Sequence, residues 1–119
     1  LPNVRVEPLD YSRLLNSHPI IGEWYKSKFN KTSSFGYAHM SDLLRYVMLY
    51  QYGGTYMDTD FISIRPLPDY DFIGRQSDDY VCNAIIQVRK KNSMLMKMIL
   101  RATFRSYKAH EWSSIGPYL

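Results

Sequence analysis

Two aspartates one residue apart, Asp58 and Asp60, are the side chains best placed for chemistry. They follow a short β-favouring segment at residues 55–57, and in an extended chain residues i and i+2 point to the same side. Two carboxylates about 4 Å apart repel each other by about 4 kcal/mol at an effective dielectric constant of 20. A divalent cation removes this cost. Oxygen ligands favour Mg²⁺ or Mn²⁺, which keep positions open for phosphates, so we predict a metal and diphosphate site here.

The residues before this pair strengthen the interpretation, because an Asp-x-Asp triplet alone is more typical of a solvated turn. Gly53 and Gly54 form an elbow between a predicted helix at residues 38–52 and a predicted strand at residues 55–57. The pair therefore follows the carboxyl end of a strand that we expect to be buried. Ligands bind at that edge in open α/β sheets.

A second candidate group lies on the predicted helix, where Asp42 and Arg45 are three residues apart and share a face. Tyr46 and Leu49 lie on the same face, which is not the apolar one. Spacing alone favours an exposed ion pair, worth ~0.3–0.5 kcal/mol, over a pair that reaches a polar ligand near the elbow. The apolar face consists of Met40, Leu43, Leu44, Val47 and Met48.

The elements that must position these residues are both helices and strands, which indicates the α/β class. Ser41 is the expected N-cap of the helix before the elbow, and Gly53 is its expected C-terminal cap. We predict strands or extended structure at residues 4–9, 55–57, 61–64 and 80–88, and helices at 11–16, 20–29, 38–52 and 93–107.

Composition limits the possibilities further. The 119 residues suffice for one domain, and the net charge of +4 is spread too evenly for a nucleic-acid-binding surface. Cys82 is the single cysteine, so neither an internal disulfide nor a cysteine-built zinc site is possible. No apolar run reaches the ~18 residues of a membrane span. The sequence begins at Leu1 without a start methionine, and we expect it to be part of a longer protein.

The combined motifs resemble the DXD-containing sugar-transferase family. Ser-Asp-x-x-Arg at residues 41–45 and Gly-Gly-x-Tyr-x-Asp-x-Asp at residues 53–60 carry the resemblance. The most similar members are the α-1,4-galactosyltransferases that act on lactosylceramide, with the α-1,4-N-acetylglucosaminyltransferases as near relatives. Further matches are a Trp-Tyr pair at residues 24–25, Asn83-Ala84 where the family has Asn-Gly, and Trp112 followed by Gly116-Pro117. Ile115 departs from the family, which has Gln before this Gly-Pro.

The resemblance implies a GT-A fold, a Rossmann-like α/β domain that binds a UDP-sugar and Mn²⁺ or Mg²⁺. By position, Asp58 and Asp60 would contact the metal and the ribose and diphosphate of the donor, with Asp60 the preferred direct metal ligand. Asp42 and Arg45 would hold the hydroxyls of the donor sugar, and Tyr56 would line the same pocket. Residues 1–119 would form the central part of the catalytic domain, without the uridine-binding first strand and the C-terminal end.

Activity and location follow from the same resemblance. The family transfers a hexose, here with galactose favoured, to a glycan or glycolipid in α linkage with retention of configuration. Asn83 and Trp112 are candidates for acceptor contact. A lumenal Golgi location with a membrane anchor outside this chain is implied, and we expect the isolated chain to be inactive or weak.

Other interpretations stay open from the sequence. The fold could be a catalytically inactive module that binds a sugar nucleotide, or the Asp pair could belong to a phosphatase of the haloacid-dehalogenase type, although Ile62 does not fit that motif. Asn30 begins an Asn-x-Thr triplet, the acceptor pattern for N-glycosylation. His39, just before the expected helix cap, is interpreted as structural.

Overall fold

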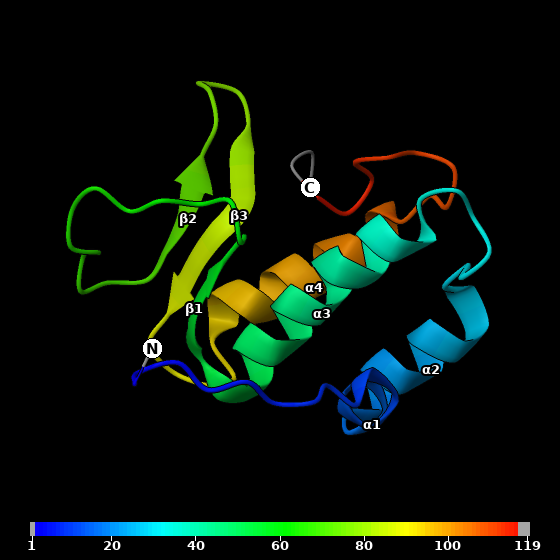
Figure 1. Cartoon of the computed structure of the whole chain (residues 1–119). Helices are drawn as coiled ribbons and strands as arrows, with labels where there is room; N and C mark the ends of the chain where they lie inside the picture. Colours follow the sequence, from blue (N-terminus) through cyan, green and yellow to red (C-terminus); the bar gives the residue numbers. More distant parts are fainter. Residues whose placement is uncertain (1, 117–119) are drawn as a thin grey trace.

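The longest element of the computed structural model, which describes residues 2–116, is the helix α3 at Gly36–Tyr52. It packs against helices on one side and a small sheet on the other (Figure 1). The other helices are α1 (Tyr11–Asn16), α2 (Pro19–Lys28) and α4 (Met94–Ser106). The sequence predicts all four helices, and α/β is the correct class.

The ends of α3 show where local signals hold and where packing overrides them. Gly53 ends the helix with φ 70°, and its N–H donates to the carbonyl of Leu49 at 2.9 Å. This conformation is accessible to glycine. The predicted N-cap at Ser41 is wrong, because the helix begins at Gly36. Burial of His39, which is 0% exposed, favours the extra turn over a cap at Ser41.

The sheet has three antiparallel strands in the order β1-β3-β2. They are β1 (Gly54–Met57), β2 (Phe72–Arg75) and β3 (Val81–Val88). The central strand β3 carries the buried residues Ile85, Ile86 and Val88. Strand β1 lies at an edge and is largely exposed, so the prediction of a buried strand before Asp58 is wrong.

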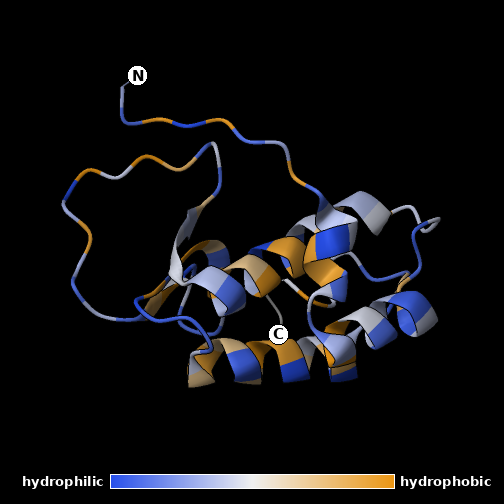
Figure 2. Cartoon of the chain, turned by 90° about the horizontal axis from the view of Figure 1, so that it is seen from below, coloured by the Kyte–Doolittle hydropathy of each residue, from blue (hydrophilic) through white to orange (hydrophobic). Residues whose placement is uncertain are grey.

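Two predicted strands are absent from the described residues. Residues 4–9 are extended but unpaired, with Val6 92% exposed, and Figure 2 shows this segment running clear of the helices. Residues 61–64 belong to a loop in which Ile62 is 83% exposed. The chain resumes the sheet only at β2, which was not predicted. In both segments apolar and polar residues alternate, but no neighbouring strand pairs with the segment.

The core lies between α3, the other helices and one face of β3. In Figure 2 the helices carry both apolar and hydrophilic bands, as expected for elements with one buried side. Within residues 2–116 we find no helix long and apolar enough to cross a membrane. The core residues are Leu14, Leu15, Ile21, Tyr25, Phe29, Leu43, Tyr46, Val47, Leu49, Ile86, Val88, Met96, Leu100 and Ile115.

Two methionines on α4 provide a test of this packing. Met96 is 0% exposed and Met98 is 61% exposed. Met96→Ala should lower the free energy of unfolding by about 2–5 kcal/mol, because it leaves a cavity. Met98→Ala should change it by less than about 0.5 kcal/mol, as is usual at an exposed position. Urea unfolding of both variants measures the difference, and equal effects would contradict the packing of α4.

Candidate functional site

A buried arginine connects α3 to the end of β1. Arg45 is only 7% exposed, and its guanidinium forms two ion pairs. Nη2 lies 3.3 Å from Oδ1 of Asp42 on the same helix. Nη1 lies 3.3 Å from Oδ1 of Asp58, directly after β1. The exposed ion pair that spacing alone favours is therefore wrong, and the structure brings three of the candidate residues together.

Neutral groups complete the surroundings of the guanidinium. Nη1 donates to the main-chain carbonyl of Asn83 in β3 at 2.9 Å, and Nη2 donates to Oγ of Ser41 at 3.2 Å. The guanidinium carbon lies 4.4 Å from the centre of the Tyr56 ring, a cation–π distance. Partners on α3, β1 and β3 therefore fix Arg45 in place.

Asp42 is the less accessible of the two carboxylates paired with Arg45. Its side chain is 13% exposed, against 33% for Asp58. Burial raises the pKa of Asp42 above its usual value, while Arg45 and a hydrogen bond from Asn83 oppose that rise. This hydrogen bond runs from Nδ2 of Asn83 to Oδ1 at 2.7 Å. Asp42 is therefore a desolvated carboxylate in a fixed position.

Tyr56, which lies on β1, binds the side chain of Asp58. Its hydroxyl donates to Oδ1 of Asp58 at 2.5 Å, and burial, followed by this hydrogen bond, raises the pKa of Tyr56 to about 12. The phenol therefore stays protonated at neutral pH and can act as a donor. The main-chain N–H of Asp58 donates to the carbonyl of Ala84 at 2.8 Å, which fixes the backbone at the end of β1.

Asp60 lies in the same turn as Asp58 but is exposed. Phe61 N–H donates to the carbonyl of Asp58 at 3.0 Å, so residues 58–61 form a turn. The extended geometry expected from residue 58 to residue 60 is therefore wrong. The sheet is also antiparallel, so the rule for ligands at the carboxyl edge of parallel strands does not apply to it. The strongest evidence for the site is instead the cluster around Arg45.

The residues present fit a divalent ion that takes few protein ligands. Among residues 2–116, no group of three or more His, Cys, Asp or Glu side chains could hold a metal. Asp58 and Asp60 offer two carboxylates, one of which is held by Tyr56 and Arg45. Mg²⁺ and similar ions bind through one or two carboxylates and take their other ligands from water and substrate phosphates.

The predicted acceptor residues differ in accessibility. Asn83 is 7% exposed, and its carboxamide is engaged by Asp42 and Tyr46. Trp112 is 63% exposed, and its ring packs edge-on against Phe35 at 5.6 Å. An acceptor role stays a prediction for both residues, although only Trp112 presents free surface.

Tyr46 is a site residue that the sequence did not indicate. It is 1% exposed and Leu49 is 4% exposed, so the face of α3 that was expected to be outside the core is buried. The Tyr46 hydroxyl donates to the carbonyl of Ile115 at 2.9 Å. The next residue, Gly116, lies so close to α3 that a Cβ added to it would be 3.1 Å from Oδ2 of Asp42. The segment at residues 113–116 thus covers this face.

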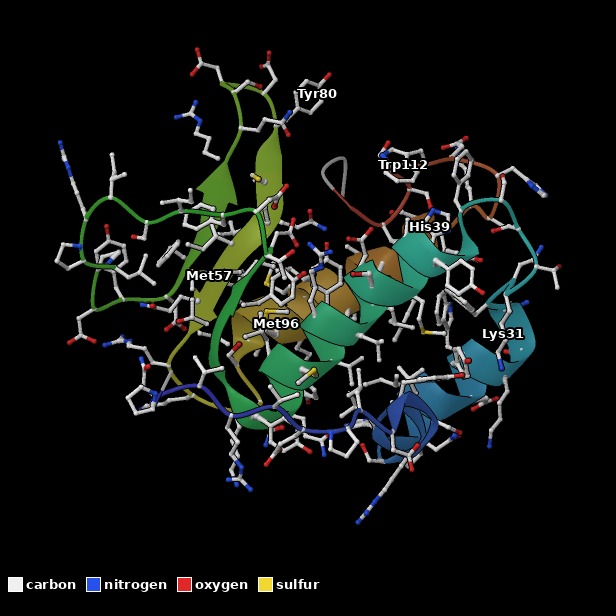
Figure 3. All side chains as sticks on the ribbon, viewed as in Figure 1. Lys31, His39, Met57, Tyr80, Met96 and Trp112 are labelled. Atoms are coloured by element: carbon white, nitrogen blue, oxygen red, sulfur yellow. The ribbon has the colours of Figure 1, made fainter. Side chains whose placement is uncertain are left out.

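His39 and Asn30 lie outside the cluster. Nε2 of His39 lies 2.8 Å from the carbonyl of Glu111 and 3.2 Å from that of Trp112, and Figure 3 shows His39 and Trp112 side by side. His39 is structural, as predicted. Oδ1 of Asn30 accepts from the N–H and hydroxyl of Thr32 at 3.0 and 2.9 Å, and its glycosylation stays a prediction. Pro117 lies outside the described residues.

A family comparison gives this cluster its context. Residues 3–86 match the family described as "Glycosyltransferase sugar-binding region containing DXD motif". The chain belongs to this family. The predicted resemblance is confirmed, and the family match removes the phosphatase alternative. The matched region includes the whole cluster of Asp42, Arg45, Tyr56, Asp58 and Asn83.

Curated relatives refine the comparison. The chain is 34% identical to human alpha-1,4-N-acetylglucosaminyltransferase over 120 residues, which cover 100% of this chain and 34% of the relative. It is 29% identical to lactosylceramide 4-alpha-galactosyltransferase from rat and from human over 119 residues, covering 99% of this chain and 32% and 33% of the relatives. It thus spans about a third of the length of these relatives. No solved structure matches the chain.

Two arginines in matched ion pairs test the buried cluster. Arg45–Asp42 and Arg75–Asp78 both have i,i+3 spacing, but the second pair is exposed, at 67% and 97%. Arg45→Gln should lower the free energy of unfolding by about 3–5 kcal/mol, because it leaves a buried carboxylate unpaired. Arg75→Gln should have little effect. Urea unfolding measures both, and a small effect at Arg45 would contradict the cluster.

Proposed function

We propose that this chain is part of a metal-dependent, retaining glycosyltransferase that moves a hexose from a UDP-sugar to a glycan or glycolipid in α linkage. The main support is the Arg45 cluster, in which one buried guanidinium holds Asp42 of α3 and Asp58 after β1. Family membership supports the same reaction class. A GT-A domain, of which this chain is the central part, is the fold that we propose for the complete protein.

Asp58 and Asp60 are the proposed ligands of Mn²⁺ or Mg²⁺ and of the donor diphosphate. The bound ion would offset the negative charge that develops on the departing diphosphate. Tyr56 and Arg45 keep Asp58 in one orientation through its Oδ1. The exposed turn leaves Asp60 accessible from solvent. One carboxylate is thus fixed before the ligand arrives, whereas the other can adjust to it.

Asp42 and Arg45 are the proposed contacts to the hydroxyls of the donor sugar. Hydrogen bonds to charged groups are stronger than neutral ones, and both residues are already held in place by Asn83. Such fixed charges need little reorganisation when the substrate binds. Galactose is the donor sugar that we favour. N-acetylglucosamine is the alternative, which the name of the human alpha-1,4-N-acetylglucosaminyltransferase raises.

The remainder of the donor pocket is proposed to come from residues outside this chain. The pocket bordered by Arg45 and Tyr56 has a volume of about 120 Å³ and is not lined by Asp42, Asp58 or Asp60, whereas ligand pockets are usually about 300–1,000 Å³. The chain spans about a third of its relatives, which leaves room for a uridine-binding strand and a C-terminal part. A Golgi membrane location, with a lumenal catalytic domain and an anchor elsewhere in the protein, is part of the same proposal.

Metal removal and one aspartate variant test the function. In the complete protein, Mn²⁺ should strengthen UDP-galactose binding, and chelation with EDTA should reverse the effect. Asp60→Asn should weaken Mn²⁺-dependent binding by at least about 10- to 100-fold, the loss typical even of outer-shell partners. Asp79→Asn, a change of the same kind at another exposed position, is the control. Isothermal titration calorimetry measures all three.

Two results would separate the alternatives. Nucleotide affinity that is the same with and without Mn²⁺ would overturn the metal-dependent transferase. Metal-dependent UDP-galactose binding without transfer to any lactose-terminated or N-acetyllactosamine-terminated acceptor would favour the inactive sugar-nucleotide-binding module.

A further inference from the structure

The hydroxyl of Tyr46 lies between the C-terminal segment and the candidate sugar contacts. It donates to the carbonyl of Ile115 at 2.9 Å and accepts from Nδ2 of Asn83 at 3.1 Å. The side chain is 1% exposed, so water does not compete for these hydrogen bonds. Tyr46 also follows Arg45 directly in the chain, so any shift of this part of α3 would move both residues.

Asn83 extends this connection to Asp42. Its Nδ2 donates to Oδ1 of Asp42 at 2.7 Å, while its main-chain carbonyl accepts from Nη1 of Arg45 at 2.9 Å. One residue of β3 therefore holds both candidate sugar contacts on α3. A continuous hydrogen-bonded chain runs from Ile115 through Tyr46 and Asn83 to Asp42.

The direction of each hydrogen bond between Ile115, Tyr46, Asn83 and Asp42 follows from which groups can donate and which can only accept. Burial raises the pKa of Tyr46, so the phenol keeps its proton, and that proton goes to the Ile115 carbonyl, which can only accept. The Tyr46 oxygen is then an acceptor toward Asn83. Asp42 is an acceptor as well, so the NH₂ end of the Asn83 carboxamide must face both Tyr46 and Asp42. A flipped carboxamide would place an oxygen against the Asp42 carboxylate.

We propose that Tyr46 is a positioning residue that orients Asp42 through Asn83 for binding of the donor sugar. This inference rests on the proposed function, in which Asp42 and Arg45 contact the sugar. Without the Tyr46 hydroxyl, Asn83 loses one of the two acceptors that set the orientation of its carboxamide, and the carbonyl of Ile115 loses its donor. The backbone at Gly116, where a Cβ would lie 3.1 Å from Oδ2 of Asp42, would then lose one of the contacts that hold it beside that carboxylate.

Tyr46→Phe removes this single hydroxyl and keeps the ring in the core. In the complete protein with Mn²⁺, it should weaken UDP-galactose binding by about three- to tenfold, the range expected for one buried hydrogen bond. Binding of UDP should stay within about twofold of wild type, because UDP lacks the hexose that Asp42 is proposed to contact. Calorimetry with the two nucleotides separates sugar positioning from a general loss of fold.

Tyr107→Phe is a matched control for the loss of a phenol. The Tyr107 hydroxyl also makes a hydrogen bond of 2.9 Å, accepting from the main-chain N–H of Asn30, but this hydroxyl is not part of the hydrogen-bonded series that ends at Asp42. This variant should bind both nucleotides as wild type does. Asn83→Ala breaks the proposed chain at its middle and leaves the Tyr46–Ile115 bond intact. It should reproduce the selective loss of UDP-galactose affinity even if Tyr46→Phe does not fold.

A double variant tests whether Tyr46 acts through Asp42. Residues that act through one contact are not additive, so adding Tyr46→Phe to Asp42→Asn should weaken UDP-galactose binding by less than twofold. An additive effect, equal losses for UDP and UDP-galactose, or a Tyr46→Phe that matches the control would overturn the inference alone. A wild-type protein that binds neither nucleotide would overturn the proposed function as well.

Discussion

The buried guanidinium of Arg45 is the constraint on which the rest of this structure depends. Removing a charge from water costs several kcal/mol unless partners of good geometry replace the lost hydration. Those partners are Asp42 on α3, Asp58 after β1 and the main chain of Asn83 in β3. Because these partners lie on α3, directly after β1 and in β3, the guanidinium joins the helix to the sheet.

The same requirement fixes two of the candidate residues in place. Asp42 and Asp58 are held by Arg45 and also by a second group each, Asn83 and Tyr56. Fixed charges of this kind are effective because they need not reorganise when a substrate binds. Asp60, in an exposed turn, has no such partner among residues 2–116. The candidate residues thus divide into a buried group on α3 and at the end of β1 and an exposed carboxyl group in the turn.

The sequence was sufficient for local features and insufficient where the partner of a segment lies far along the chain. Helical spacing and Gly53 located α3, and the helix predicted at residues 93–107 agrees with α4 to within one residue at each end. The Asp42–Arg45 spacing and the Asp-x-Asp pair pointed to three residues, Asp42, Arg45 and Asp58, that the structure brings together, but burial of this face of α3 could not be predicted. Periodicity shows one apolar face of α3, whereas β3 and the C-terminal segment cover a second. Strand β2 was also missed, because its partner β3 lies further along the chain. The register of this pairing shifts between Ile73 and Gly74.

Two tyrosines show how a buried polar network can avoid further charge. Tyr46 and Tyr56 flank Arg45 in the site, and burial raises the pKa of both phenols, so each is a neutral donor there. A carboxylate at position 46 or 56 would add a negative charge beside Asp42 or Asp58. A lysine at either position would compete with Arg45 for the carboxyl groups of these two aspartates. With neutral phenols beside them, Asp42 and Asp58 share the guanidinium of Arg45. Asp60 adds a third carboxyl group at the edge that solvent reaches. Acidic side chains thus extend to the open edge of the cluster, while the arginine lies inside it.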